Sequence, residues 1–167
     1  ANVSGGYDFI SSSTIAGDGN GRDSDPSDPG DYSGGSSSSW HGTHVAGTVA
    51  AVTNNATGVA GTAFGAKVVP VRVLGRCGGL TSDIADAITW ASGGTVSGVP
   101  ANANPAEVIN MSLGGGGSCS TTYQNAINGA VGRGTTVVVA AGNSNTNVSS
   151  AVPANCPNVV AVAATGV

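Results

Sequence analysis

The two histidines of the chain, His41 and His44, lie three residues apart in the segment His41-Gly-Thr-His-Val-Ala-Gly-Thr48. Residues at this spacing share one face of a helix, and the apolar residues that follow have helical periodicity. The pair suits a metal site, a structural role against backbone groups, or a general base, because neutral imidazole accepts protons near neutral pH. A helical zinc motif also needs a Glu, and no Cys or third His is available as a ligand. Spacing therefore disfavours zinc and leaves the other two roles open.

The acidic stretch Gly17–Asp31 contains five of the nine acidic residues. Charges crowded in this way repel one another unless solvent or a cation screens them. Ca²⁺ takes about six to eight oxygen ligands in flexible geometry, and Gly and Pro allow a loop to fold around it. The stretch is not an EF-hand loop, because Arg22 occupies the third ligand spacing. A solvated acidic loop is the alternative, but we favour calcium, with these ligands: Asp18, Asp23, Asp25, Asp28 and the carbonyl of Arg22.

Composition narrows the class of protein. The chain has 167 residues, 28 of them glycine, with five basic residues and a net charge of −4. This length suits one domain with one core. The absence of a basic patch disfavours nucleic-acid binding, and no apolar run is long enough to span a bilayer. The sequence has no signal peptide and no initiator Met, so we expect a processed or trimmed chain, and low Lys with abundant Ser, Thr, Asn and Gly favours secretion.

Two hydrophobic periods alternate along the chain. Runs rich in β-forming residues predict the following strands: Gly6–Ile10, Val68–Leu74, Val108–Leu113, Thr135–Ala141 and Val159–Ala164. Helical spacing predicts three helices: Gly42–Thr53, Thr81–Ser92 and Ser120–Val131. Strands that alternate with helices favour a parallel sheet flanked by helices, and therefore an α/β fold.

Local signals refine these elements. Pro70 lacks an N–H and so marks a strand start or an edge. Ser82 is expected to cap the helix that follows it, and Gly134 lies just past the end of another helix. The apolar runs Thr135–Ala141 and Val159–Ala164 are expected to be buried on both faces. Polar or Gly-rich stretches follow three strands, where α/β proteins place their chemistry: Gly75–Gly79, Ser112–Gly115 and Gly142–Asn145.

The histidine segment resembles the histidine motif of the subtilases, the subtilisin-like serine proteases. Val108–Gly114 resembles the substrate-binding strand of that family, and Val137–Asn143 resembles the strand that carries its oxyanion asparagine. Val69–Leu74 and Pro153–Val162 also fit. Three motifs in the expected order make the likeness specific, and it extends over nearly the whole chain. It implies a subtilisin-like parallel sheet.

The resemblance implies roles for individual residues. His41 would be the general base, taking the proton of a serine hydroxyl and later donating it to the leaving amine, with His44 structural. Asn143 would donate its amide to the oxyanion, although without the family it reads as a turn residue. An extended peptide would lie between two backbone segments: Gly78 and Gly79 on one side, and Ser112, Leu113 and Gly114 on the other. Ala141 and Gly142 would line the first specificity pocket.

Two motifs of the family are absent from this sequence. No strand ends in Asp-Thr-Gly or Asp-Ser-Gly, and no Gly-Thr-Ser occurs. Asp8 and Ser112 match other positions and are not substitutes. We therefore expect residues 1–167 to be the central segment of one peptidase domain, inactive alone. Exposed sheet edges predict a partner, either the remainder of the protease or a second copy in a homodimer.

The chain has three cysteines, so one thiol lacks a mate within it. Cys77 and Cys119 each follow a predicted strand in a Gly-rich loop, which makes them the favoured disulfide. Such a bridge would contribute on the order of 4 kcal/mol in the chain-entropy model. Cys156 would then be a buried free thiol or would have lost its partner.

The family likeness also bears on calcium. Bacterial secreted subtilases with a similar acidic insert support calcium in Gly17–Asp31. A second site is expected at Thr53–Gly58, which resembles the calcium loop after the histidine helix but looks one residue longer. Whether that second site is filled stays open.

Three functions compete. The first is a secreted, calcium-stabilised serine endopeptidase represented by an incomplete chain. The second is a catalytically dead peptide- or calcium-binding module of the same fold. The third is a nucleotide-binding domain, raised by the four glycines that end at Gly117, but the chain lacks Gly-Lys-Ser/Thr and the spaced Rossmann glycines. We favour the first.

Overall fold

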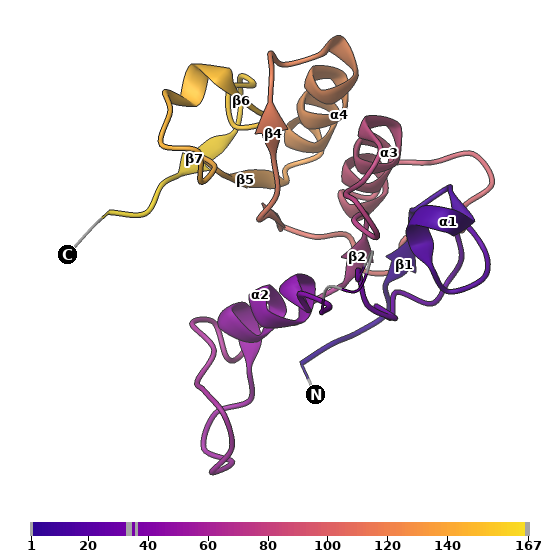
Figure 1. Ribbon diagram of the computed structural model, residues 1–167, viewed down its shortest axis with the longest axis vertical. Coiled ribbons are helices and arrows are strands. Elements are labelled where there is room, and N and C mark those ends of the chain that lie inside the picture. The colour runs from indigo at the N-terminus through magenta and orange to yellow at the C-terminus, as the bar shows by residue number, and fades with distance from the viewer. Residues whose placement is uncertain (1, 33–34, 36, 166–167) are drawn as a thin grey trace. The chain divides into compact units, whose positions relative to one another are not determined.

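A computed structural model describes residues 2–32, 35 and 37–165. The chain divides into two compact units, Ala1–Ile84 and Ala85–Val167. Both contain helices and strands (Figure 1), and the parallel strand pairs confirm the α/β class. Among the described residues, no helix combines the length and the apolar character that crossing a bilayer requires. The prediction of a single partial peptidase domain over residues 1–167 stays a prediction.

The first unit contains a short parallel strand pair. Its elements are β1 (Tyr7–Asp8), α1 (Ser13–Ala16), α2 (His41–Ala50) and β2 (Val71–Arg72). β1 and β2 pair in register Tyr7↔Val71, directly after Pro70, as the missing N–H of that proline predicts. Phe9, Ile10 and Ala16 are fully or almost fully buried and form the apolar centre of the unit.

Charged side chains are buried beside this apolar centre. Arg72 donates hydrogen bonds to the carboxylate of Asp8, to Asp18 at 2.9 Å and to the carbonyl of Ala16. Asp8 is completely buried, and this burial raises its pKa, although the ion pair with Arg72 opposes the shift. Arg72 therefore connects the strand pair to the start of the acidic stretch.

The second unit is built on a parallel sheet. The boundary between the units falls within α3 (Thr81–Ala91). The elements after it are β3 (Val108–Met111), β4 (Gly115–Gly116), α4 (Thr121–Gly132), β5 (Thr136–Ala140), the 3₁₀ turn η1 (Val148–Ser150), β6 (Ala151–Val152) and β7 (Val160–Val162). The strand order is β3-β5-β7, all parallel. α4 contacts β5, and Ile127, Val137 and Val139 are buried between them and their neighbours.

The predicted elements occur at the expected places, with three corrections of detail. Ser82 is not the cap of α3, because the helix already begins at Thr81. β5 is not buried on both faces: Val137 and Val139 are buried, whereas Thr136 is exposed and Val138 is half-buried. The third correction concerns β7, which was expected to be buried on both faces and is exposed along its length. Alternating burial is normal for a strand with one covered face.

The predicted Cys77–Cys119 disulfide is wrong. Cys119 is bonded to Cys156, with a Cα–Cα distance of 5.1 Å, and Cys77 is a free, exposed thiol. The reason is the antiparallel β4–β6 pair, in which Gly116 faces Ala151. This pairing brings the segment before α4 beside the segment after β6, within the span that a disulfide needs.

Candidate functional site

The predicted general base lies at the start of a helix. His41 is the first residue of α2, and both His41 and His44 are exposed to solvent. The preceding residue, Trp40, has a left-handed backbone with φ 51°. The amide of His44 donates to the carbonyl of Trp40 at 3.1 Å, which closes the first turn. His41 is therefore an accessible imidazole on a helix start whose backbone conformation is unusual.

Ser39, two positions before His41, is hydrogen-bonded to the carboxylate of Asp31. Asp31 accepts hydrogen bonds from both the amide and the hydroxyl of Ser39, each at 2.6 Å. The Ser39 hydroxyl oxygen in turn accepts the amide N–H of His41 at 3.3 Å. The Ser39 hydrogen bonds hold the pKa of Asp31 below its ordinary value.

The Gly-rich stretch after β2 forms a tight turn. Gly75 and Gly78 exchange backbone hydrogen bonds of 2.9 and 3.2 Å, and Cys77 lies between them with φ 66°. Gly78 has φ 110°, and a Cβ on Gly79 would lie 2.1 Å from the carbonyl oxygen of Val73. The predicted peptide-binding glycines are thus required by the local backbone as well.

Two predicted site segments meet at one end of the parallel sheet in the second unit. β3 and β5 pair with Met111 opposite Val139, so Ser112–Gly114 and Ala141–Asn143 both follow the carboxyl ends of neighbouring strands. This edge is where α/β proteins bind ligands. Asn143 and Gly142 are exposed, and Ala141 donates its N–H to the carbonyl of Val162 at 2.9 Å.

The remaining residues of this edge have constrained backbones. Gly142 has φ 96°, a left-handed conformation that favours glycine. A Cβ on Gly114 would lie 3.0 Å from the carbonyl oxygen of Val152. Ser112 and Leu113 are half-buried, and the Ser112 hydroxyl accepts the side-chain amide of Asn110 at 3.0 Å. The local backbone therefore accounts for Gly114 and Gly142, and the peptide-binding role of this edge stays a prediction.

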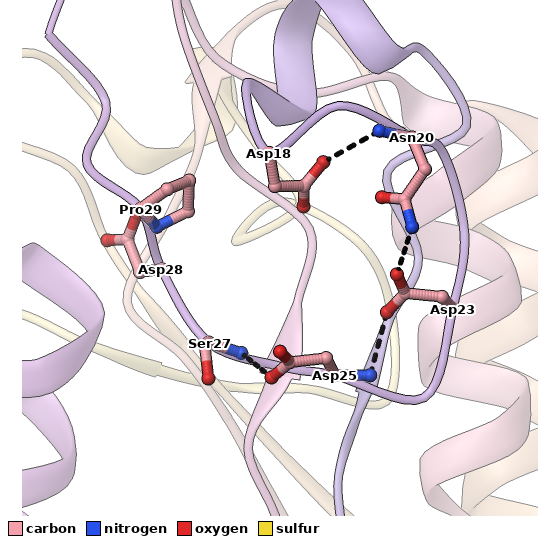
Figure 2. A pocket seen from close by; sticks show the side chains of 7 residues that line it. All are labelled: Asp18, Asn20, Asp23, Asp25, Ser27, Asp28 and Pro29. Atoms are coloured by element: carbon pink, nitrogen blue, oxygen red, sulfur yellow. Dashed lines mark hydrogen bonds between the residues drawn. The ribbon is translucent and has the colours of Figure 1, made fainter.

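The acidic stretch surrounds a cavity of about 270 Å³ in the first unit (Figure 2). Four of the predicted calcium ligands line it, together with three residues that the prediction did not include: Asn20, Ser27 and Pro29. Arg22 does not line the cavity. Its side chain donates to the Phe9 carbonyl at 3.0 Å and to the Asp83 carboxylate at 2.6 Å.

Local hydrogen bonds occupy several of these carboxylate oxygens. Asp23 accepts from the Asn20 side chain at 2.5 Å and from the Asp25 amide at 2.7 Å, as Figure 2 shows. The hydrogen bonds from Ser27 hold the pKa of Asp25 below its ordinary value. In the parts of the chain that the structure describes, no three His, Cys, Asp or Glu side chains are grouped to hold a metal ion. The oxygen chemistry fits Ca²⁺, but the carboxylates do not converge.

The predicted second calcium loop also lines a cavity. Residues 52–60, which include Thr53–Gly58, surround about 280 Å³. The side chain of Asn55 accepts the amide of Thr57 at 3.1 Å. This loop contains no carboxylate, so the only oxygens it offers to a cation are neutral.

Sequence reasoning missed the Asp31–Ser39 contact, because the two residues lie eight positions apart in a stretch without regular periodicity. It also missed Asn20, whose place between Asp18 and Asp23 was a usable signal, since amide oxygens are calcium ligands as well. The catalytic, oxyanion and peptide-binding roles of the predicted residues remain predictions.

Comparison with known proteins gives a consistent result. The model of the Subtilase family matches residues 8–166. An extracellular protease of Xanthomonas campestris pv. campestris is 76% identical over 174 residues, which cover 99% of this chain and 30% of the relative. Thermitase of Thermoactinomyces vulgaris is 38% identical over 164 residues, covering 98% of this chain and 48% of the relative.

A solved structure agrees with the sequence comparison. A protease from Pseudoalteromonas arctica PAMC 21717 is 66% identical, with a TM-score of 0.96, and the match covers 99% of this chain and 51% of that one. The chain thus spans between about a third and a half of the length of these relatives. Because the family match extends over nearly all of its residues, the chain belongs to the subtilase family.

Proposed function

We propose that the chain is part of a secreted serine endopeptidase that hydrolyses peptide bonds by Ser-His-Asp chemistry. The observation that carries this proposal is the accessible imidazole of His41 at the start of α2, in a chain that belongs to the subtilase family. Relatives from Xanthomonas campestris pv. campestris and Dichelobacter nodosus are named extracellular proteases, which supports secretion.

In the proposed reaction His41 acts as the general base. Its neutral imidazole takes the proton from the hydroxyl of a serine as that oxygen attacks the peptide carbonyl carbon, and the imidazolium then returns the proton to the leaving amine. Asn143 donates its side-chain amide to the negatively charged oxygen of the tetrahedral intermediate. The exposed position of Asn143 after β5 is compatible with that role. Acyl-enzyme hydrolysis by water completes the cycle.

The substrate is proposed to be an extended polypeptide. Main-chain groups of Ser112–Gly114, directly after β3, would pair with its backbone, and Gly78 and Gly79 would pair with its other side. Ala141 and Gly142 have small side chains, so the wall of the first specificity pocket that they form accepts a large apolar group.

The 167-residue chain is proposed to be inactive alone, because it lacks the aspartate and serine motifs. A fluorophosphonate probe, which labels activated serines, tests this directly. We expect labelling of the complete Xanthomonas relative and no labelling of this chain. Covalent labelling of this chain, at a serine that peptide mapping identifies, would contradict the proposal.

The roles of individual residues need an active molecule. A suitable one is a chimera in which this chain replaces the matching segment of the Xanthomonas relative, with which it shares 76% identity. In this chimera His41→Ala should lower kcat by about a millionfold, as known for the corresponding loss in a subtilisin. Asn143→Ala should lower it by about a hundred- to a thousandfold, a range also measured in a subtilisin. His44→Ala and Asn145→Ala serve as matched controls, and a control loss equal to that of its partner would overturn the assignment.

We propose that calcium binds in the acidic cavity and stabilises the first unit. Asp18, Asp23, Asp25 and Asp28 would supply carboxylate oxygens and Asn20 an amide oxygen. Arg22 does not line the cavity, so its carbonyl would have to turn toward the ion to serve as the further ligand. The carboxylates would have to exchange local hydrogen bonds for metal bonds, since several accept backbone amides now. A bound cation would also relieve the repulsion among them.

Calorimetry on this chain tests the calcium proposal. We expect binding of Ca²⁺ and a higher melting temperature, with Mg²⁺ much weaker because it demands stricter geometry. Asp23→Asn should weaken binding, whereas Glu107→Gln, an exposed carboxylate in the other unit, should not. Calcium binding that survives Asp23→Asn and Asp25→Asn together would place the metal elsewhere.

We also propose that the sheet edges of the second unit bind either the remainder of the protease or a second copy of the chain. Val108 in β3 is 57% exposed, and Val160 and Val162 in β7 are each 52% exposed. Both strands are outer strands of the sheet, where unpaired backbone groups invite pairing. A chain that remains monomeric at high concentration and keeps its native circular dichroism would remove the reason for the second-copy alternative.

A further inference from the structure

The backbone just before His41 adopts a conformation that is costly for its residue. Trp40 has φ 51°, in the left-handed region that bulky side chains rarely occupy. Such residues persist only where surrounding contacts hold them, and they gather at functional sites. Trp40 is 49% exposed, so burial of its side chain explains little of this conformation. The contacts of its neighbours must supply the constraint.

Those contacts come from Asp31 and Ser39. Two hydrogen bonds of 2.6 Å fix Ser39 to the carboxylate of Asp31. The hydroxyl of Ser39 donates a hydrogen bond to Asp31, and its oxygen accepts a hydrogen bond from the amide N–H of His41. A continuous chain of hydrogen bonds therefore runs from a carboxylate to the backbone of His41. Charge-assisted bonds of this kind are shorter and stronger than neutral ones.

Comparison with α4 shows what is unusual about the start of α2. α4 is capped by Ser120, the residue directly before the helix, which accepts the amide of Tyr123 at 3.2 Å. In α2 the corresponding position is Trp40, whose indole has no acceptor. The capping hydroxyl is instead supplied one residue earlier, by Ser39, and a carboxylate from a different part of the loop anchors it. The first turn of α2 is thus held by Ser39 and Asp31, two residues that precede the helix.

We propose that Asp31 is a positioning residue for His41: through Ser39 it fixes the first turn of α2 and so the direction in which the imidazole is presented. The proposal rests on the proposed function of His41 as general base. Its consequence is catalytic, since a misplacement of about 1 Å can cost about a hundredfold in rate. The lowered pKa of Asp31 agrees with a carboxylate that is ionised and bonded.

The first experiment measures amide hydrogen exchange and side-chain couplings by NMR on this chain in calcium-free buffer. In Asp31→Ala the amides of His41 and His44 should exchange at least about tenfold faster, and the His41 side chain should average over several rotamers. The amide of Ala51, bonded to Gly47 at the other end of α2, is the internal reference and should not change. Asp28→Ala is the matched control, because it removes a carboxylate of the same loop that bonds Gly30 instead.

The second experiment separates positioning from a direct effect of charge. Ser39→Ala breaks the link but leaves the charge of Asp31 in place, and Ser39→Thr keeps the hydroxyl. If Asp31 acts by positioning, Ser39→Ala reproduces the NMR changes of Asp31→Ala and Ser39→Thr restores the wild-type pattern. If Ser39→Ala leaves the His41 and His44 amides unchanged, or if Asp31→Ala and Asp28→Ala behave alike, the proposal is wrong.

The chimeric protease supplies the catalytic readout. Asp31→Ala and Ser39→Ala should each lower kcat by about ten- to a hundredfold with KM nearly unchanged, and Ser39→Thr should recover most of the loss. Glu107→Gln controls for the loss of one negative charge. An inactive wild-type chimera would count against the proposed function, whereas the NMR result would still decide whether Asp31 positions His41. Wild-type kcat in Asp31→Ala would overturn the proposal.

Discussion

The two units of this chain are stabilised by different means. In the first, residues 1–84, charged side chains are buried together: Asp8 is fully buried, Arg72 is 7% exposed and Asp83 is 1% exposed. The second unit, residues 85–167, is held together by a three-stranded parallel sheet and by the apolar contact of α4 with β5. The Cys119–Cys156 disulfide adds a covalent link. The first unit thus depends on paired charges and the second on apolar burial and a covalent bond.

Each unit is therefore destabilised by a different kind of substitution. A buried ion pair adds little compared with an apolar pair of the same shape, but losing one partner leaves a charge without compensation. Apolar burial fails more gradually, as each removed group costs its own transfer and cavity energy. The candidate base, His41, belongs to the charged unit, and the predicted oxyanion donor, Asn143, to the apolar one. Substitutions that act on one unit should therefore affect one of these residues first.

The largest effect is expected for Arg72→Met. The substitution keeps an apolar stem but leaves the carboxylate of Asp8 buried without its ion pair, which should cost about 3–5 kcal/mol in the free energy of unfolding. Hydrogen exchange followed by mass spectrometry should show faster exchange in peptides from residues 2–32 and 65–80. Arg133→Met is the control, because Arg133 is exposed and bonds Ser92 in the second unit. A loss below about 1 kcal/mol would mean that Asp8 is already neutral or hydrated.

The next largest effect is expected for removing the disulfide. Replacing Cys119 and Cys156 together by Ser opens a loop of 37 residues, which should cost about 2–4 kcal/mol. Exchange should accelerate in β4, β6 and the start of α4, while the first unit keeps its protection. Cys77→Ser is the matched control, because its thiol is free and exposed. Equal destabilisation by Cys77→Ser would indicate the Cys77–Cys119 pairing that the sequence favoured.

These two cases also show what sequence can predict. Periodicity located β3, β5 and α4, because apolar spacing reports directly on burial against neighbours. It did not reveal the Cys119–Cys156 bond, since that bond depends on the antiparallel β4–β6 pair, whose strands have two residues each, Gly115–Gly116 and Ala151–Val152. Pairs this short carry no period. The half-exposed face of β5 was missed for a related reason: an apolar run does not show which face is covered.

The candidate site divides in the same way. Motif and apolar period predicted the helix start at His41 and the strand ends before Ser112 and Ala141, and the structure has them there, while the roles of these residues stay predictions. The acidic cavity was anticipated from charge density, but its neutral lining by Asn20 and Ser27 was not. The Asp31–Ser39 contact depends on the path of an irregular loop, and neither residue type nor spacing specifies that path.

The smallest effect concerns pH, where the first unit contains carboxylates of opposite behaviour. Hydrogen bonds from Ser27 lower the pKa of Asp25, and burial raises the pKa of Asp8. Between its lowered and ordinary pKa values, Asp25 binds more protons in the unfolded chain, so the free energy of unfolding rises with pH there. This contribution is present above the ordinary pKa and is lost as the pH falls through the lowered one. For Asp8 the contribution is present below the ordinary pKa and is lost as the pH rises through the raised one.

Denaturant unfolding in calcium-free buffer from roughly pH 2 to 7 can separate the two carboxylates. Asp25→Asn should reduce the rise in the free energy of unfolding with pH in the acid range. The variant lacks the carboxylate that, between its lowered and ordinary pKa values, binds more protons in the unfolded chain than in the folded one. Asp8→Asn should instead remove a fall of stability at higher pH. The sign of the change in slope is the test, because the exposed Asp25 contributes little to the free energy of unfolding. If both variants change the slope in the same sense, burial does not dominate at Asp8, and the ion pair with Arg72 must outweigh the cost of placing both charges in the interior of the first unit.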